Sequence, residues 1–304
     1  MKITLLPVLA LAAVWSLRAA DNDYVEHVDS LYNSLTIERT GSIVELRARA
    51  HGGEALESAV DLADPLRLVV RYTRTLFGGL FFRPQPSRVL MIGLGGAGFH
   101  RLFTAAFPAA RLQTVELDPK VYELTQSRLA FQPTAQTPVA LLDGRLFVKR
   151  DRTKWDWIVL DAFRGGYVPA HLKTEEFYRE CAARLDDRGV FISNLHSSTA
   201  LYYSDIKTIM AVFPQVVLLH TAGTGNVIIF AVKYASPAIT DPAKWPKPAE
   251  IFPAALAARL DLDAIRRERI EVPLSRVSTA RLLTDDFSPV EFLDTVKSNN
   301  TGAR

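Results

Sequence analysis

The sequence predicts an α/β protein built around a parallel β-sheet. A fully apolar run at residues 89–92 is followed by comparable, mostly apolar runs up to residue 219, and helical stretches lie between most of them. Strands that are apolar along their whole length and alternate with helices indicate a parallel sheet covered on both faces. With 304 residues, of which 48% are hydrophobic, the chain is long enough for a full core. The six runs are residues 89–92, 112–117, 139–142, 157–160, 190–193 and 216–219.

The first twenty residues, 1–20, have the pattern of a secretory signal peptide. Lys2 precedes an uncharged apolar stretch, and the small residues Ala19 and Ala20 follow it. The apolar stretch is shorter than the roughly 20 residues that a helix needs to span a bilayer. We therefore expect an exported or periplasmic protein with no stable membrane span. A cytoplasmic or membrane-tethered protein is the alternative.

A small N-terminal β element is expected over residues 21–65. Residues 34–40 and 42–49 are rich in β-forming side chains, and Gly41 separates them. The second run alternates apolar and charged residues, as a strand with one exposed face does. Together the two runs predict a half-exposed hairpin.

The large domain is expected to cover residues 66–235. Apolar residues at helical spacing predict a helix over 66–82, which ends before two prolines. A second helix is expected after Thr174, whose hydroxyl suits the N-cap position, and Gly189 is expected to follow the end of that helix. Such helices would cover the apolar strands.

The last apolar run meets another one, at 226–232, across a short glycine-containing turn at 222–225. This arrangement predicts a terminal antiparallel hairpin beside the parallel sheet, which is the usual plan of the Rossmann-like class I methyltransferase fold. Five prolines within 237–253 then indicate a linker. Residues 236–304 are therefore expected to form a linker and an appendage of helices and loops.

The composition disfavours two kinds of partner. The chain has 36 Lys and Arg against 33 Asp and Glu, a formal net charge of +3, and no basic run interleaved with aromatic residues. A nucleic-acid-binding surface requires such a basic footprint. The single cysteine, Cys181, excludes an internal disulfide, and no Cys/His cluster has the spacing of a zinc or iron–sulfur site. We expect neither a nucleic-acid partner nor a bound metal.

A glycine-rich motif follows the first apolar run and opens a helix. It contains Gly93, Gly95 and Gly98, and Glu116 stands at the end of the next run. Glycines let the backbone approach a ligand closely, and an acid at the second strand tip accepts hydrogen bonds from ribose hydroxyls. The motif alone suits an NAD-dependent dehydrogenase equally well. Together with the strand, helix and acid, it predicts a nucleoside site.

Two further acids are expected at strand ends. Asp143, followed by Gly144, comes after the third run, and Asp161 ends the fourth. Because ligands of doubly wound sheets bind beyond the carboxyl ends of the strands, Asp143, Asp161 and Glu116 should converge on one crevice. A dehydrogenase would not need Asp143, whereas a site that grips an adenine amino group would. Each acid taken alone is equally well explained as a loop cap.

The chain resembles the spermidine synthases, or polyamine aminopropyltransferases, especially the bacterial spermidine synthase-like proteins. The resemblance covers roughly residues 24–235 and a further segment near the C-terminus. Its motifs are DSLYN at 29–33, SAVDL at 58–62, VLMIGLGGAG at 89–98, VELDP at 115–119, DG at 143–144, DAF at 161–163, VPAHL at 168–172, TEEFY at 174–178 and LTDDFSPVE at 283–291.

The resemblance implies a co-substrate and a role for each acid. The co-substrate would be decarboxylated S-adenosylmethionine or S-adenosylmethionine, with no metal, and family members commonly form homodimers. Glu116 would hold the ribose, Asp143 the adenine amino group, and the glycine loop with Gly144 the rest of the nucleoside. Asp161 matches the catalytic aspartate. There, an aminopropyl group passes from a sulfonium to an amine, which must lose a proton.

The chain departs from the family where the amines should sit. An aspartate of the glycine loop is replaced by Gly96, and the second aspartate of the catalytic loop is replaced by Arg164. Near Tyr72, which matches a substrate-binding tyrosine, an acid is missing and Arg74 is present. An arginine beside Asp161 would neutralise it or pair with a substrate carboxylate, so we expect weak transfer to putrescine.

Three functions remain open at this point. An aminopropyltransferase-like enzyme acting on an amine or another small nucleophile is the first, and an S-adenosylmethionine-dependent methyltransferase is the second. An exported, non-catalytic nucleoside-binding protein is the third, which the leader favours. Asp285 and Asp286 would restore the missing negative charge as substrate ligands if the C-terminal tail folds over the crevice; otherwise they form a turn.

Overall fold

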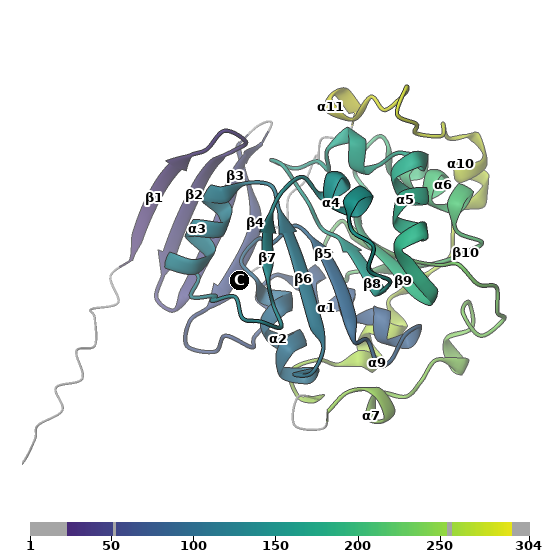
Figure 1. Cartoon of the computed structure of the whole chain (residues 1–304), viewed down its shortest axis with the longest axis horizontal. Coiled ribbons are helices and arrows are strands. Elements are labelled where there is room, and N and C mark those ends of the chain that lie inside the picture. The colour runs from purple at the N-terminus through teal and green to yellow at the C-terminus, as the bar shows by residue number, and fades with distance from the viewer. Residues whose placement is uncertain (1–22, 51–52, 254–256, 294–304) are drawn as a thin grey trace, which may run out of the picture.

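The computed structural model describes residues 23–50, 53–253 and 257–293, which form two β-sheets and their covering helices (Figure 1). The expected leader at 1–20 lies outside the described residues. The small sheet is antiparallel, with the order β1-β2-β3-β4, and the large one has the order β12-β10-β11-β9-β8-β5-β6-β7. Within the described segments, every helix is too short or too polar to cross a membrane.

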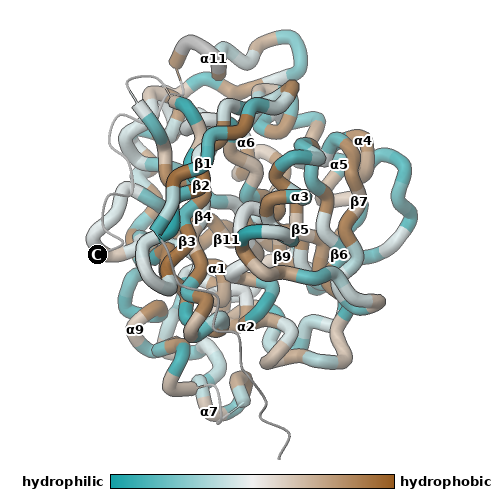
Figure 2. The backbone as a smooth tube through the Cα atoms, turned by 90° about the vertical axis from the view of Figure 1, so that its left-hand side faces the viewer, coloured by the Kyte–Doolittle hydropathy of each residue, from teal (hydrophilic) through white to brown (hydrophobic). Residues whose placement is uncertain are grey.

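The small sheet contains the expected hairpin and two further strands. Its strands are β1 (Tyr24–Asp29), β2 (Ser34–Thr40), β3 (Ile43–Ala50) and β4 (Gly53–Asp61). Hydrophobic and hydrophilic residues alternate along it, so one face is buried (Figure 2). That face packs on α3 (Pro119–Ser127): Ile37 and Leu46 share a core with Val121 and Leu124. The small sheet thereby stands against the large domain.

The large sheet confirms the predicted fold. All six predicted runs are strands, and the first five pair in parallel with their neighbours. The antiparallel hairpin of β10 and β11 follows, and β11 pairs with β9. The strands are β5 (Arg88–Ile92), β6 (Arg111–Glu116), β7 (Val139–Leu141), β8 (Trp155–Leu160), β9 (Leu185–His196), β10 (Gln215–His220), β11 (Asn226–Val232) and β12 (Arg269–Ile270).

Helices cover both faces of the large sheet (Figure 1). Side chains of α1, α2 and α9 share one core with alternate residues of β5 and β8. Those of α4, α5 and α6 share a second core with the intervening residues of the same strands. The helices are α1 (Arg71–Leu76), η1 (Phe77–Phe81), α2 (Gly98–Ala106), α4 (Gly144–Arg150), η2 (Ala170–Leu172), α5 (Glu175–Arg184), α6 (Tyr202–Val212), η3 (Pro242–Lys244), α7 (Pro248–Ile251), α9 (Leu262–Arg267), α10 (Leu274–Thr279) and α11 (Val290–Leu293).

The helix predicted over 66–82 is shorter than expected. It begins at Arg71 and continues from Phe77 as the 3-10 segment η1. Two consecutive glycines in η1 weaken a helix. They also allow close packing, because a Cβ at Gly79 would lie 2.7 Å from Ile192 Cδ1. Contact with the sheet therefore overrides the helical pattern here.

Two expectations about the second half of the chain need correction. Thr174 does cap α5, since its side chain accepts a hydrogen bond from Phe177 N. Gly189, however, does not follow the end of that helix but lies inside β9, where a Cβ would come within 2.8 Å of the Trp155 carbonyl oxygen. The C-terminal appendage also contributes a strand, β12, which pairs with β10.

Candidate active site

A cavity opens at the carboxyl ends of the parallel strands and is closed on one side by the small sheet. Most of the predicted site residues line it, so the three strand-tip acids do converge. From the small sheet come Tyr32, Asn33, Glu57 and Ser58, which were not predicted as site residues. The predicted residues that line the cavity are Tyr72, Gly93, Gly95, Gly98, Glu116, Asp143, Gly144, Asp161 and Arg164.

The glycine motif forms the floor between two strand tips. Gly93 has φ +102°, and a Cβ there would lie 2.2 Å from the carbonyl oxygen of Asp161. A larger residue would be strained and would push the two strand ends apart. Gly98 begins α2, as the motif predicted. The motif thus brings the first strand tip against Asp161.

Glu116 lies at the end of β6 and is almost completely buried. Its Oε2 accepts a hydrogen bond from Leu94 N at 3.0 Å, and its Oε1 accepts one from Asp118 N at 2.8 Å. Burial raises the pKa of Glu116 to about 7, although these backbone amides oppose the rise. Each carboxylate oxygen retains a further lone pair for a ligand hydroxyl.

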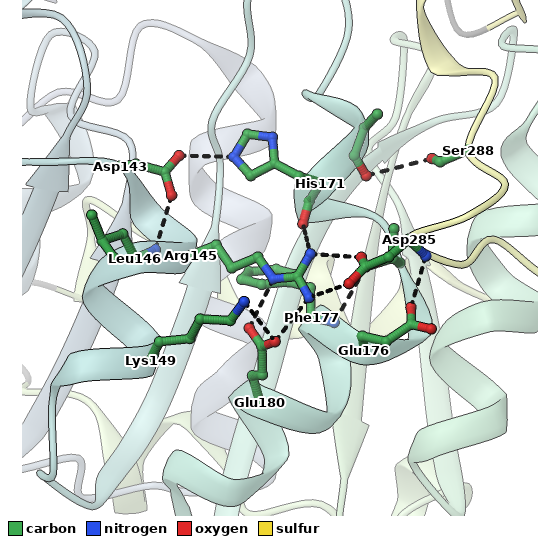
Figure 3. Close-up of polar contacts among 12 residues, drawn as sticks. Asp143, Arg145, Leu146, Lys149, His171, Glu176, Phe177, Glu180, Asp285 and Ser288 are labelled. Carbon is green, nitrogen blue, oxygen red and sulfur yellow. Dashed lines mark hydrogen bonds and ion pairs between the residues drawn. The ribbon is translucent and has the colours of Figure 1, made fainter.

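Asp143 has both of its carboxylate oxygens engaged by the protein. Oδ1 caps α4 by accepting a hydrogen bond from Leu146 N at 2.8 Å, and Oδ2 lies 2.8 Å from His171 Nε2 (Figure 3). The hydrogen bond to His171 is the main reason that the pKa of Asp143 is lowered. Asp143 is therefore a helix cap as well as a cavity residue.

Asp161 follows β8 and is held by side chains from two other elements. Tyr72 Oη donates to its Oδ2 at 3.1 Å, and Asn194 Nδ2 donates to its Oδ1 at 3.0 Å. Asn226 Nδ2 in turn donates to Asn194 Oδ1, which directs the amide of Asn194 toward Asp161. Burial raises the pKa of Asp161 despite both hydrogen bonds. Asn194, at the polar end of an apolar strand, was missed by the sequence analysis.

Glu57 is the acid of the cavity that the sequence analysis overlooked. Strand β4 contains a bulge there: Leu46 pairs with Ser58 and Arg47 with Leu56, which leaves Glu57 as the extra residue. A bulge redirects a side chain, and Glu57 and Ser58 both face the cavity. The sequence signal was the pair of polar residues inside an otherwise apolar stretch. Burial, followed by the charge of Asp161, raises the pKa of Glu57 to about 8.

The loop after Asp161 is attached to the small sheet. Arg164 Nε donates to the carbonyl oxygen of Tyr32 at 2.9 Å, so the arginine side chain is exposed at the rim. A Cβ at Gly165 would lie 2.2 Å from the Arg49 carbonyl, and the φ of Gly165 is +56°. The guanidinium is thus directed to a backbone carbonyl, while the hydrogen bonds to Asp161 come from Tyr72 and Asn194.

Gly96 and Arg74 are placed differently from what the family pattern suggests. A Cβ at Gly96 would lie 2.6 Å from Ser58 Oγ and 2.7 Å from Leu129 Cδ2, so both of these side chains would have to move to admit an acid there. Arg74 Nη2 forms an ion pair with Glu268 at 2.7 Å and so ties α1 to the C-terminal appendage. Neither residue lines the cavity.

The structure places Asp285 beside Arg145 and not in the cavity (Figure 3). Both of its oxygens accept hydrogen bonds from Arg145, at 2.6 and 2.7 Å, and Arg145 also binds Glu180. These hydrogen bonds lower the pKa of Asp285 to about 2. Asp286 is exposed in a turn outside the cavity lining. Asp285 thus anchors the C-terminal segment, and neither Asp285 nor Asp286 lies in the cavity lining, where substrate ligands were expected.

The arrangement has a clear chemical consequence. Three acids with raised pKa values face one cavity, and their described hydrogen bonds come from backbone amides, a tyrosine and an asparagine. Such carboxylates can accept a proton or bind a cation or hydroxyl groups. Within the described part of the chain, no group of three or more His, Cys, Asp or Glu side chains is placed to hold a metal ion.

Comparison with known proteins identifies the family. The model of the spermine/spermidine synthase domain matches residues 70–228. A polyamine aminopropyltransferase of Vibrio vulnificus is 32% identical, over 87% of this chain and 89% of the relative. One of Chromobacterium violaceum is 34% identical, over 64% of this chain and 75% of the relative.

A solved structure agrees in fold. The crystal structure of a probable spermidine synthase from Corynebacterium glutamicum has a TM-score of 0.61 at 20% identity, over 70% of this chain and 81% of that chain. This similarity in fold agrees with the sequence matches. The match to the family model alone covers more than half of the chain. The chain therefore belongs to the spermine/spermidine synthase family.

Proposed function

We propose that this protein transfers the aminopropyl group of decarboxylated S-adenosylmethionine to a primary amine and leaves methylthioadenosine. One observation carries the proposal: a strand-tip acid suited to ribose, Glu116, and a half-buried acid suited to proton transfer, Asp161, face the same cavity. Family membership and the name of the Vibrio vulnificus relative support the same reaction.

The nucleoside end of the cavity is assigned to Glu116, Asp143 and the glycine loop. The two oxygens of Glu116 each accept a backbone amide, and the carboxylate keeps further acceptor capacity toward the cavity, which suits the hydroxyls of a ribose. The adenine amino group is assigned to Asp143, next to Gly144. Because both Asp143 oxygens already have partners, this hydrogen bond would use the remaining lone pairs.

The transfer itself is assigned to Asp161. The amine nitrogen attacks the aminopropyl carbon that is bonded to the sulfonium sulfur. A C–N bond forms there, and the bond between that carbon and sulfur breaks. The electron pair of that bond passes to sulfur, which becomes a neutral thioether. The proton lost by the amine nitrogen passes to the Asp161 carboxylate. A raised pKa suits a proton acceptor, and Tyr72 and Asn194 hold the carboxylate in place.

The test measures the products formed by the purified full-length chain. With decarboxylated S-adenosylmethionine and a panel of primary amines, we expect methylthioadenosine and the aminopropylated amine in equal amounts. With S-adenosylmethionine and the same amines, we expect no S-adenosylhomocysteine. Release of S-adenosylhomocysteine would identify a methyltransferase, and nucleoside binding without either product would identify a binding protein.

Export is a separate proposal, supported by the pattern of residues 1–20. Residues 1–30 fused to a reporter that works only outside the cytoplasm should give an active reporter. The mature protein should begin near Ala20 or Asp21. An intact Met1 on the protein recovered from the cytoplasm would contradict this proposal.

A further inference from the structure

We propose that Glu57 binds a primary ammonium group in the cavity and takes the place of the acids that the family carries at the positions of Gly96 and Arg164. The inference rests on the proposed function and concerns the same cavity. It assigns the amine-binding charge to the small N-terminal sheet, whereas the nucleoside and transfer acids belong to the large sheet.

A bulge in β4 places Glu57 in the wall of the cavity. In a regular strand, neighbouring side chains point to opposite faces, so Glu57 and Ser58 could not both face the same space. The bulge at Glu57 removes that restriction, and both residues line the cavity. Bulges are found preferentially next to active sites, where they redirect a side chain.

The carboxylate of Glu57 is only partly satisfied by the protein. The nearby Gly165 amide favours its ionised form and lowers its pKa, but its Oε1 is buried and has no hydrogen-bond partner among the described residues. Leaving a buried acceptor without a partner is costly, and the cost is greater when the group is charged. A donor that arrives with a ligand would meet this requirement, and a carboxylate favours a cationic donor.

The surroundings of Glu57 also select a cation. After burial, the charges of Asp161 and Glu116 raise the pKa of Glu57 further. The pKa of the Tyr72 hydroxyl is likewise raised by burial and then by the charges of Asp161 and Glu57. Acids held this close repel one another when ionised, and an ammonium group between them relieves the repulsion. On binding, Glu57 would release its proton to solvent and keep the negative charge.

The positions of the missing family acids agree with this assignment. Ser58 Oγ, one residue after Glu57, lies 2.6 Å from the place that a Cβ at position 96 would take, so β4 stands directly beside the glycine loop at this point. Arg164 points to the Tyr32 carbonyl at the rim. The inner cavity therefore contains more negative charge than the family positions alone indicate, which changes the expectation of weak putrescine binding.

Two ammonium groups are candidate ligands of Glu57: the distal ammonium of a diamine acceptor and the aminopropyl ammonium of the decarboxylated donor. The experiment distinguishes between them. Glu57→Gln removes the charge and keeps the size of the side chain, and Glu54→Gln makes the same change at an exposed position of β4. One arm titrates putrescine and butylamine into protein saturated with methylthioadenosine. The other compares decarboxylated S-adenosylmethionine with methylthioadenosine, which lacks the aminopropyl ammonium.

We expect Glu57→Gln to weaken the binding of one of the two ammonium ligands by about tenfold or more, which is the scale of a charged hydrogen bond. Methylthioadenosine should bind within about threefold of wild type, which shows that the site is intact, and Glu54→Gln should change nothing. A loss for putrescine but not butylamine assigns Glu57 to the distal ammonium of the acceptor. A loss for the decarboxylated donor alone assigns it to the aminopropyl ammonium.

Unchanged binding of both ligands in Glu57→Gln would overturn the inference, as would an absence of ammonium binding by the wild-type protein. Because the readout is binding, it does not depend on turnover. A selective loss in Glu57→Gln, in a protein that forms no methylthioadenosine, would reject the proposed function and retain the ammonium site.

Discussion

Glu57, Glu116 and Asp161 in the cavity have electrostatic surroundings opposite to those of Asp285 beside Arg145. In the cavity, burial raises the pKa values of Glu57 and Glu116 to about 8 and about 7. Beside Arg145, a two-pronged contact lowers the pKa of Asp285 to about 2, and Glu180 shares the same guanidinium (Figure 3). Arg145 lies in the first turn of α4, directly after the cavity residue Gly144, but neither Arg145 nor Asp285 lines the cavity.

The direction of the pKa shift distinguishes acids that stabilise the fold from acids that are available to bind a ligand. An acid paired with arginine contributes stability, whereas a buried acid with a raised pKa lowers the stability of the empty protein once it is ionised. A carboxylate retained at that cost is a candidate for binding or catalysis. By this criterion, Asp285 is structural, and Glu57 belongs to the site.

The largest effect is expected from Asp161→Asn. The amide cannot accept the proton of the amine nitrogen, so the transfer rate should fall on the order of 10² to 10⁴. Affinity for methylthioadenosine should remain within a few-fold, because the nucleoside is assigned to other residues. Single-turnover kinetics and calorimetry measure the two quantities. Unchanged turnover would remove Asp161 from the mechanism.

Arg145→Gln should have the largest effect on stability. The change leaves Glu180 and Asp285 without their guanidinium, and it should lower the free energy of unfolding by about 1 to 3 kcal/mol, because the guanidinium is buried but the Asp285 side chain is 43% exposed and screened by solvent. Urea denaturation at neutral pH measures this loss. Arg150→Gln, at the exposed end of α4, is the matched control and should cost little. Equal stability of the two variants would contradict a structural role for the cluster.

Glu116→Ala should weaken nucleoside binding by about 1.5 to 3 kcal/mol, the scale for removing a charged hydrogen-bonding partner. It also leaves the amides of Leu94 and Asp118 without their acceptor. Calorimetry with methylthioadenosine measures the loss. Glu123→Ala, on the exposed side of α3, should bind like wild type. If both variants bind equally well, the assignment of ribose to Glu116 is wrong.

The smallest effect concerns the stability of the empty protein as a function of pH. Glu57 has an ordinary pKa of 4.5 and a pKa of about 8 in the folded chain. As pH rises from 4.5 to 8, the unfolded chain releases this proton first, so the wild type should lose stability relative to Glu57→Gln. We expect a difference on the order of 1 kcal/mol between pH 5 and pH 8, allowing for solvent in the open cavity. Parallel stability profiles would contradict the raised pKa.

The contacts within the large sheet were largely predictable, because they depend on short-range patterns. Each of the six apolar runs is a strand of the eight-stranded sheet, and the glycine motif with Glu116 and Asp161 predicted residues that line the cavity. A run of consecutive apolar residues has few alternatives to a buried strand. Thr174 could also be identified as a cap from the sequence, because its hydroxyl contacts the amide of Phe177, only three residues further along the chain.

The sequence by itself therefore determined the α/β fold, the family and the glycine-loop end of the cavity. Only the tertiary structure decided which acids remain available in the cavity. It brought Glu57 to Asp161 through a bulge in a different sheet, and it bound Asp285 to Arg145, whose side chain lies 140 positions earlier in the chain. The physical reason is that the pKa of a carboxylate depends on its burial and on charges that contact it across the fold, and neither is encoded in the spacing of neighbouring residues.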